Sequence, residues 1–160
     1  GGTDNSSNMN EIVRYDLSTQ NSGEWTTIAK VNEANQRGGV AFVVEDKVYA
    51  GLGEKSNGIR NGFYVSSDSL TKWELIPSIP AQLGVISSGV YDEQKKSFFM
   101  IDNDGKIWEY NLTTEQWTSR SLWIRMKNYH MFMLDGSIYI LGQDIYQKNK
   151  FTVYNPIWDN

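Results

Sequence analysis

The sequence contains an internal repeat, and this feature constrains the fold more strongly than any other. Four tryptophans recur at spacings of 48, 44 and 41 residues, namely Trp25, Trp73, Trp117 and Trp158. A tyrosine lies upstream of each, at Tyr15, Tyr64, Tyr110 and Tyr154. A period of about 20–50 residues is typical of folds that stack one supersecondary unit per repeat. We therefore expect a repeat architecture in which Trp25, Trp73 and Trp117 pack between neighbouring units.

Within each repeat the pattern predicts four short strands. An apolar strand, a tight turn and a second apolar strand fill residues 38–54 and 128–144, with a more degenerate copy at 87–104. Nearly continuous apolar runs are typical of strands buried on both faces, whereas the later strands of each unit are more polar. Asp135-Gly136 predicts a two-residue hairpin turn between two inner strands. The inner strands are expected near 40–44, 87–91 and 129–134.

These features resemble the kelch repeat, which folds as a blade of a β-propeller. The matching residues are Arg37 before an apolar strand, Val48-Tyr49 and Ile138-Tyr139 after the turn, and a Tyr-Asn pair followed by tryptophan, as in 110–117. The double glycine that usually follows the second strand is reduced to a single glycine. The resemblance implies an all-β fold, a β-propeller of four-stranded antiparallel kelch-like blades. Residues 11–160 would supply about three and a half blades.

A second resemblance concerns one hairpin. Residues 66–73, Ser-Ser-Asp-Ser-Leu-Thr-Lys-Trp, are similar to the Asp-box of sialidase-type propellers. Leu70 stands where that motif normally has its turn glycine. The resemblance implies a structural fold-back at the rim of a blade rather than a catalytic element. A plain polar hairpin is the alternative interpretation.

The number of predicted blades raises a question of completeness. Closed propellers typically have about 4–8 blades, and an open stack of repeats leaves an end face to be covered. We therefore expect either part of a longer propeller or a homodimer in which two chains complete one ring. In the second case the strand around Trp25 would lie against residues 151–154.

Charge and residue types exclude several functions. With 15 Lys and Arg against 19 Asp and Glu, the net charge is −4, which leaves no basic field for nucleic acid. No apolar run reaches the roughly 18 residues of a transmembrane helix. The absence of cysteine and the presence of a single histidine, His130, exclude thiol catalysis and a zinc site of nitrogen and sulfur ligands. They also exclude the copper site of galactose oxidase-like kelch enzymes. We expect no metal and no cofactor.

A short acidic segment is similar to a calcium-binding loop, but the residues that follow it do not support calcium binding. Residues 102–105, Asp-Asn-Asp-Gly, are similar to the opening of a calcium loop, but Lys106 and Trp108 stand where oxygen ligands are needed. A hairpin turn between the strands 99–101 and 107–110 explains the segment better. His130 is expected to be a structural histidine of an inner strand, with a channel ligand as the alternative.

The first ten residues differ in composition from the rest. Residues 1–10, Gly-Gly-Thr-Asp-Asn-Ser-Ser-Asn-Met-Asn, are small and polar, which predicts a disordered leader. Such a segment resembles the tether that follows the lipidated cysteine of bacterial envelope lipoproteins. It indicates a location in the bacterial cell envelope, periplasmic or at the surface, with a lipid anchor.

One connection carries residues suited to ligand binding. Trp123, Arg125 and Tyr129 lie in or beside the segment 121–128 that leads into a new inner strand, and Arg37 occupies the corresponding connection of an earlier blade. Such connections open on one face of a propeller, where ligands usually bind. Aromatic planes beside arginines suit a sugar or an anionic sugar. An ordinary packed loop is the alternative.

Two function classes remain open after these exclusions. The first is a non-catalytic, secreted propeller module that binds a glycan or a protein partner through its loop face. The second is a carbohydrate-active enzyme similar to the kelch-type sialic acid mutarotases. No catalytic residues can be assigned from the sequence, which favours the first class.

Overall fold

The computed structural model describes residues 3–4, 7–8, 11–17, 23–30, 38–55, 58–59, 62–67, 70–80, 88–102 and 104–156. Within these ranges the regular elements are antiparallel strands and the turns between them, with no α-helix. The predicted all-β class is therefore confirmed. Predictions that rest on Arg37 and Trp158 fall outside the described residues.

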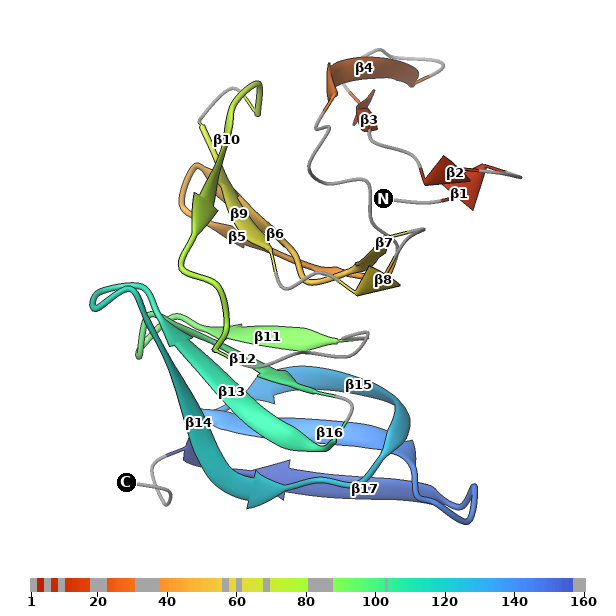
Figure 1. Cartoon of the computed structure of the whole chain (residues 1–160), viewed down its shortest axis with the longest axis vertical. Helices are drawn as coiled ribbons and strands as arrows, with labels where there is room; N and C mark the ends of the chain where they lie inside the picture. Colours follow the sequence, from red (N-terminus) through yellow and green to blue (C-terminus); the bar gives the residue numbers. More distant parts are fainter. Residues whose placement is uncertain are drawn as a thin grey trace.

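Three sheets form the body of the molecule (Figure 1). Sheet I contains β5 (Val40–Val44), β6 (Lys47–Gly51), β9 (Phe63–Ser66) and β10 (Trp73–Ile76). Sheet II contains β11 (Gly89–Asp92), β12 (Ser97–Ile101), β13 (Lys106–Asn111) and β14 (Gln116–Trp123). Sheet III contains β15 (Lys127–Leu134), β16 (Ser137–Gln143) and β17 (Asn149–Tyr154). In each sheet the strands follow one another in chain order.

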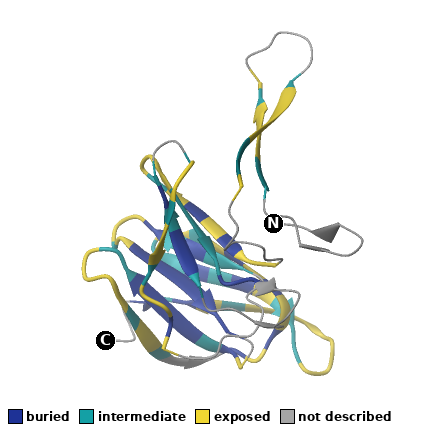
Figure 2. Ribbon diagram, turned by 45° about the horizontal axis from the view of Figure 1, so that its top comes forward, coloured by how far each residue is buried: buried dark blue, intermediate teal, exposed yellow. Residues whose placement is uncertain are grey.

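Three smaller ladders accompany these sheets. β3 (Glu11–Asp16) pairs with β4 (Glu24–Lys30), and this hairpin lies apart from the three sheets (Figures 1 and 2). β7 (Glu54–Lys55) pairs with β8 (Gly58–Ile59). β1 (Thr3–Asp4) pairs with β2 (Ser7–Asn8) inside the segment that was predicted to be a leader. The disorder of that segment stays a prediction.

The first strand of each sheet lies beside the first strand of its neighbour, since β11 contacts both β5 and β15. These three strands correspond to the predicted inner strands. The turn between β15 and β16 is the two-residue hairpin that Asp135-Gly136 predicts. Both residues have positive φ, 49° and 71°, as the tight turn with the right twist requires.

Apolar side chains fill the two spaces between the sheets, and these buried residues appear dark blue in Figure 2. Sheet II lies between its neighbours, and all five residues of β12 are buried. Phe98 faces sheet I, where its ring stacks on Phe42 with centroids 4.4 Å apart. Phe99 faces sheet III and belongs to the second cluster. Burial on both faces explains why β12 is almost continuously apolar.

The recurring tryptophans have different environments. Trp117 packs between sheets as predicted, because its ring lies 6.0 Å from that of Phe63 and its Nε1–H donates to the carbonyl of Pro77 at 2.6 Å. Trp73 closes its own hairpin, with Nε1–H donating to the carbonyl of Leu70 at 3.1 Å. The reason is the face that each occupies: Trp117 lies opposite Tyr110 on the face of sheet II that packs on sheet I, whereas Trp73 lies opposite Ser66 on the face of sheet I that points away from sheet II. The prediction that Trp25 packs between units is wrong: Trp25 is 68% exposed, because the hairpin β3–β4 that carries it lies apart from the three sheets.

The segment 66–73 forms a hairpin between β9 and β10. The backbone N–H of Ser67 donates to the carbonyl of Lys72, and that of Leu70 donates to the carbonyl of Ser67. Leu70 has a φ of 59°, the left-handed conformation that glycine adopts most readily. Leu70 therefore takes the conformation expected of the turn glycine that it replaces. Asp68 and Ser69 lie outside the described residues.

The acidic segment after β12 is a hairpin turn. The carboxylate of Asp102 accepts hydrogen bonds from the backbone N–H groups of Asp104 and Lys106, at 3.0 and 2.9 Å. Its second oxygen accepts the Nε1–H of Trp108 at 2.9 Å. These bonds use the side chain of Asp102 to hold the turn between β12 and β13, in agreement with the hairpin interpretation.

Candidate functional site

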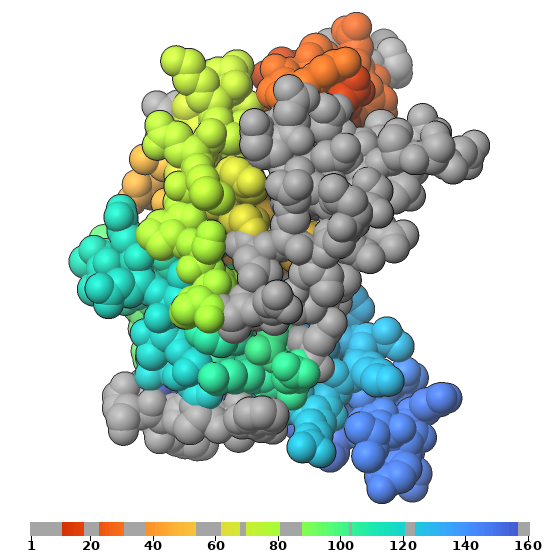
Figure 3. Space-filling view, viewed as in Figure 1, coloured from red at the N-terminus to blue at the C-terminus, as the bar shows by residue number. Residues whose placement is uncertain are grey.

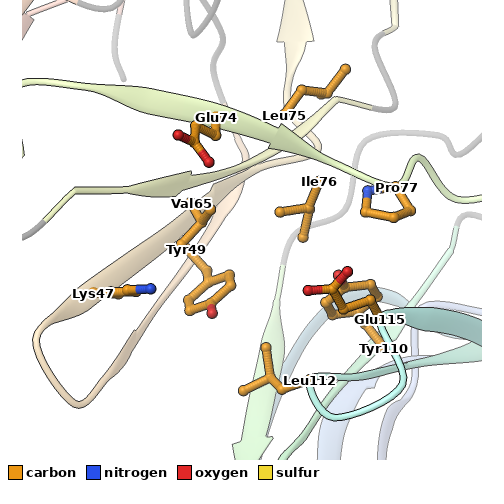
Figure 4. Close-up of a pocket in the computed structure, with 10 residues that line it drawn as sticks. All are labelled: Lys47, Tyr49, Val65, Glu74, Leu75, Ile76, Pro77, Tyr110, Leu112 and Glu115. Atoms are coloured by element: carbon orange, nitrogen blue, oxygen red, sulfur yellow. The ribbon is translucent and has the colours of Figure 1, made fainter.

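A pocket of about 300 Å³ opens where the outer strands of sheets I and II meet (Figure 4). In the space-filling view, β10 of sheet I lies against the residues of β13 and β14 (Figure 3). The pocket lies along this boundary. Its lining residues are Lys47, Tyr49, Val65, Glu74, Leu75, Ile76, Pro77, Tyr110, Leu112 and Glu115.

The polar lining groups come from separate elements. Lys47 and Tyr49 belong to β6, Glu74 to β10 and Tyr110 to β13. Glu115 comes from the turn between β13 and β14, where it lies beside Tyr110 (Figure 4). The pocket thus combines two tyrosine hydroxyls, two carboxylates and one ammonium group with apolar side chains.

Local sequence explains the position of Glu115. The carboxamide oxygen of Asn111 accepts the backbone N–H groups of Thr113 and Thr114, both at 2.9 Å. This is the side-chain turn that asparagine favours after a strand. The N–H of Glu115 then donates to the carbonyl of Asn111 at 2.8 Å, and Glu115 takes a φ of 55°. Residues 111–115 thereby carry the carboxylate to the rim of the pocket.

Both tyrosine hydroxyls of the pocket stay protonated well above neutral pH. Burial raises the pKa of Tyr110 to about 12, with smaller contributions from Glu115 and Tyr49. Burial also raises the pKa of Tyr49, and the neighbouring Tyr91, Glu115 and Glu45 add to the effect. Protonated hydroxyls both donate and accept hydrogen bonds. Tyr49 is the more accessible of the two, since it is half-buried whereas Tyr110 is 2% exposed.

We expect alkaline conditions to destabilise the protein through Tyr110. Its pKa is about 12 in the folded protein against 10.0 for a free side chain, so the unfolded chain ionises first. This contribution to the free energy of unfolding is therefore fully present below pH 10 and falls as the pH approaches 12. Denaturant titrations across this range, in the parent and in Tyr110→Phe, measure it. Equal slopes of stability against pH in the two proteins would contradict the assignment.

Of the four residues that the sequence singles out on the loop face, the structure describes the side chains of two, Arg125 and Tyr129. Arg37 lies outside the described residues, and the side chain of Trp123 does too, although its backbone ends β14 opposite Lys106. Arg125 is exposed, between the buried Ile124 and Met126. Among the predicted binding residues whose side chains are described, Arg125 is the exposed one. Ligand binding at the loop face stays a prediction.

Tyr129 occupies the core instead of the loop surface. It is 4% exposed, and its hydroxyl donates to the carbonyl of Ile101 in sheet II. Its ring belongs to the apolar cluster between sheets II and III. The physical reason is strand alternation: in β15, Tyr129 shares a face with Met131, and both point toward sheet II. A sugar could not stack on this ring without opening the core.

Sequence reasoning missed the pocket because its lining comes from two different repeats. The sequence shows no partner for the carboxylate of Glu115. The available signal is Tyr110, one of the recurring tyrosines, and Tyr49 of the Val48-Tyr49 element, which the fold places at one boundary. The sequence shows no partner for Glu109 either, and the structure joins it to Arg120, whose Nε–H donates to Oε2 of Glu109 at 2.8 Å.

Among the described residues, no cluster of three or more histidine, cysteine or acidic side chains is placed to hold a metal ion. In the same residues no helix has the length and apolarity needed to cross a membrane.

The arrangement of antiparallel sheets with adjacent first strands is of the β-propeller class. Solved structures share it, among them that of YjhT, to which this chain is similar with a TM-score of 0.53 and 18% sequence identity. The similarity covers 70% of this chain and 36% of the YjhT chain, so it spans little more than a third of that protein. At this identity it shows the fold alone. No family model matches the sequence, and no curated protein matches it.

Proposed function

We propose that the protein is a non-catalytic propeller module of the kelch type that binds a carbohydrate in the pocket between sheets I and II. The observation that carries the proposal is that Tyr49 and Tyr110 line one pocket of about 300 Å³ together with Glu74 and Glu115. Binding pockets typically combine apolar surface with a few polar groups that fix orientation. Carboxylates and hydroxyls are suitable partners for the many hydroxyl groups of a sugar.

The charge of the pocket supports a neutral sugar over an anionic one. Its two carboxylates outnumber its single ammonium group, Lys47. An anionic sugar such as a sialic acid would meet like charge here, which disfavours binding. The alternative of a sialic acid mutarotase-like enzyme instead relies on arginines of the loop face, of which Arg125 is exposed.

We expect Glu115→Gln to weaken the binding of a neutral glycan by about 10–100-fold. A hydrogen bond to a charged group contributes about 1.5–3 kcal/mol, and the substitution removes the charge while keeping the shape of the side chain. A glycan array identifies the ligand, and isothermal titration calorimetry then measures the affinity of the parent and the variant. Tyr49→Phe should weaken binding by a smaller factor, since it removes one neutral hydroxyl.

Arg125→Ala is the matched control, because Arg125 is exposed and does not line the pocket. Its affinity for the same glycan should equal that of the parent. Loss of binding in Arg125→Ala with full binding in Glu115→Gln would move the site to the loop face. Absence of affinity for any glycan on the array would overturn the proposal.

A further inference from the structure

The side of sheet III that faces away from sheet II is apolar and exposed. We call it the end face, and it consists of Phe132, Leu134, Tyr139, Leu141, Phe151 and Val153. The ring of Tyr139 contacts those of Phe132 and Phe151, with centroids 5.2 and 5.7 Å apart. Phe151 is 56% exposed and Phe132 43%. A continuous exposed aromatic row of this kind indicates an interaction surface.

Sheet I carries the same aromatic residues at the same strand positions. Phe42 lies opposite Tyr49 across β5 and β6, as Phe132 lies opposite Tyr139 across β15 and β16. On the third strand, Phe63 lies opposite the last residue of β6, and Phe151 takes the matching position on β17. In sheet I this row is covered, because Phe63 is fully buried against sheet II. Sheet I therefore shows what kind of surface covers such a row.

In sheet II the covering surface contains an aromatic pair on its two outer strands. Tyr110 lies opposite Trp117, with ring centroids 4.8 Å apart and an interplanar angle of 44°. Phe63 contacts both rings, at 6.5 and 6.0 Å. The Tyr–Trp pair thus packs against the third-strand member of the row, Phe63, whereas Phe42 and Tyr49 contact Phe98 of β12.

The hairpin β3–β4 presents the same pair, uncovered, at the other end of the chain. Tyr15 lies opposite Trp25, with ring centroids 4.9 Å apart and an interplanar angle of 44°. Trp25 is 68% exposed and Tyr15 42%. The geometry matches that of Tyr110 and Trp117 closely. The chain therefore carries, both exposed, a counterpart of Phe63 in Phe151 and a counterpart of the Tyr–Trp pair that Phe63 contacts.

We propose that the end face of sheet III binds the Tyr15–Trp25 hairpin of a second copy of this chain. The two surfaces lie at opposite ends of the molecule, with sheets I and II between them (Figure 1), so one chain does not bring them together in this arrangement. In a head-to-tail dimer, the end face of each copy binds the Tyr15–Trp25 hairpin of the other copy, so both end faces and both hairpins are covered. The surfaces differ from each other, so the contact is heterologous rather than a face meeting its own copy.

The oligomeric state of designed variants tests this proposal. Light scattering should give the parent a mass twice the 18.3 kDa of the chain. Phe151→Asp and Trp25→Asp should each be monomeric, because each places a charge in one half of the contact. Both positions are more than half exposed in the single chain, so circular dichroism should show unchanged folding. Tyr146→Asp is the matched control. Tyr146 is 75% exposed and lies in the turn between β16 and β17, outside the end face, so the Tyr146→Asp protein should remain dimeric.

Mixing the two monomeric variants provides the decisive result. The Trp25 variant keeps an intact end face and the Phe151 variant keeps an intact hairpin, so an equimolar mixture should form a heterodimer through one contact. A dimer that survives Trp25→Asp but not Phe151→Asp would show that end faces meet each other, and it would overturn the proposal. A parent protein that stays monomeric at every concentration would overturn it too, as would open-ended assemblies.

Discussion

Replacing Phe63 with alanine should lower the free energy of unfolding by about 3–5 kcal/mol, the usual cost of removing a large buried aromatic side chain. Phe63 is 0% exposed, and its ring contacts Phe98 from the facing sheet at 5.7 Å. Removing it leaves a cavity between sheets I and II that the flanking strands cannot close without losing their pairing. Urea denaturation followed by tryptophan fluorescence measures the change.

Phe151→Ala is the matched control for this prediction. It removes the same side chain at the equivalent position of the third strand, but Phe151 is 56% exposed. At protein concentrations where the chain is monomeric, it should cost less than about 1 kcal/mol. Equal losses in the two variants would show that sheets I and II do not share the core described here.

Replacing Arg120 with methionine should also destabilise the protein by about 3–5 kcal/mol, because it breaks a buried ion pair from one side. Glu109 is 4% exposed, and Arg120 of the neighbouring strand donates two hydrogen bonds to its Oε2. Without the guanidinium, a carboxylate remains in an apolar setting on the face of sheet II that packs toward sheet III. The cost is that of an uncompensated buried charge.

The double variant Glu109→Leu/Arg120→Met separates this cause from lost packing. Replacing both partners of a buried pair with apolar residues is often neutral, so most of the stability should return. Denaturant unfolding of the parent, the Arg120→Met protein and the double variant completes the comparison. If the double variant is as unstable as Arg120→Met, the loss comes from packing of the arginine stem rather than from the charge of Glu109.

The repeat in the sequence predicted strands and turns well because those depend on local pattern. The runs at 40–44 and 129–134 are apolar since β5 and β15 lie in the interior, and Asp135-Gly136 has the backbone freedom that a two-residue turn demands. The same pattern could not show the environment of each tryptophan. Trp73 and Trp117 look alike in the sequence, but Trp117 lies on a face that packs against a neighbouring sheet, whereas Trp73 lies on the face of sheet I that points away from sheet II.

The candidate site was harder to predict than the fold. Tyr129 stands in a sequence context that suits a binding loop, but alternation along β15 turns its ring into the core. The pocket lined by Tyr49, Glu74 and Glu115 has no signature in the chain, since its members are brought together by the packing of sheet I against sheet II.

By itself, then, the sequence determined the all-β class, the repeat, the inner strands and the turn at 135–136, because strand formation and tight turns follow from residues close together in the chain. The tertiary structure alone decided which faces are covered. Phe63 and Phe151 are the same residue at the same strand position, and one is buried while the other is exposed. The difference lies in the neighbouring sheet, since burial depends on what packs across about 10 Å of space rather than on the strand itself.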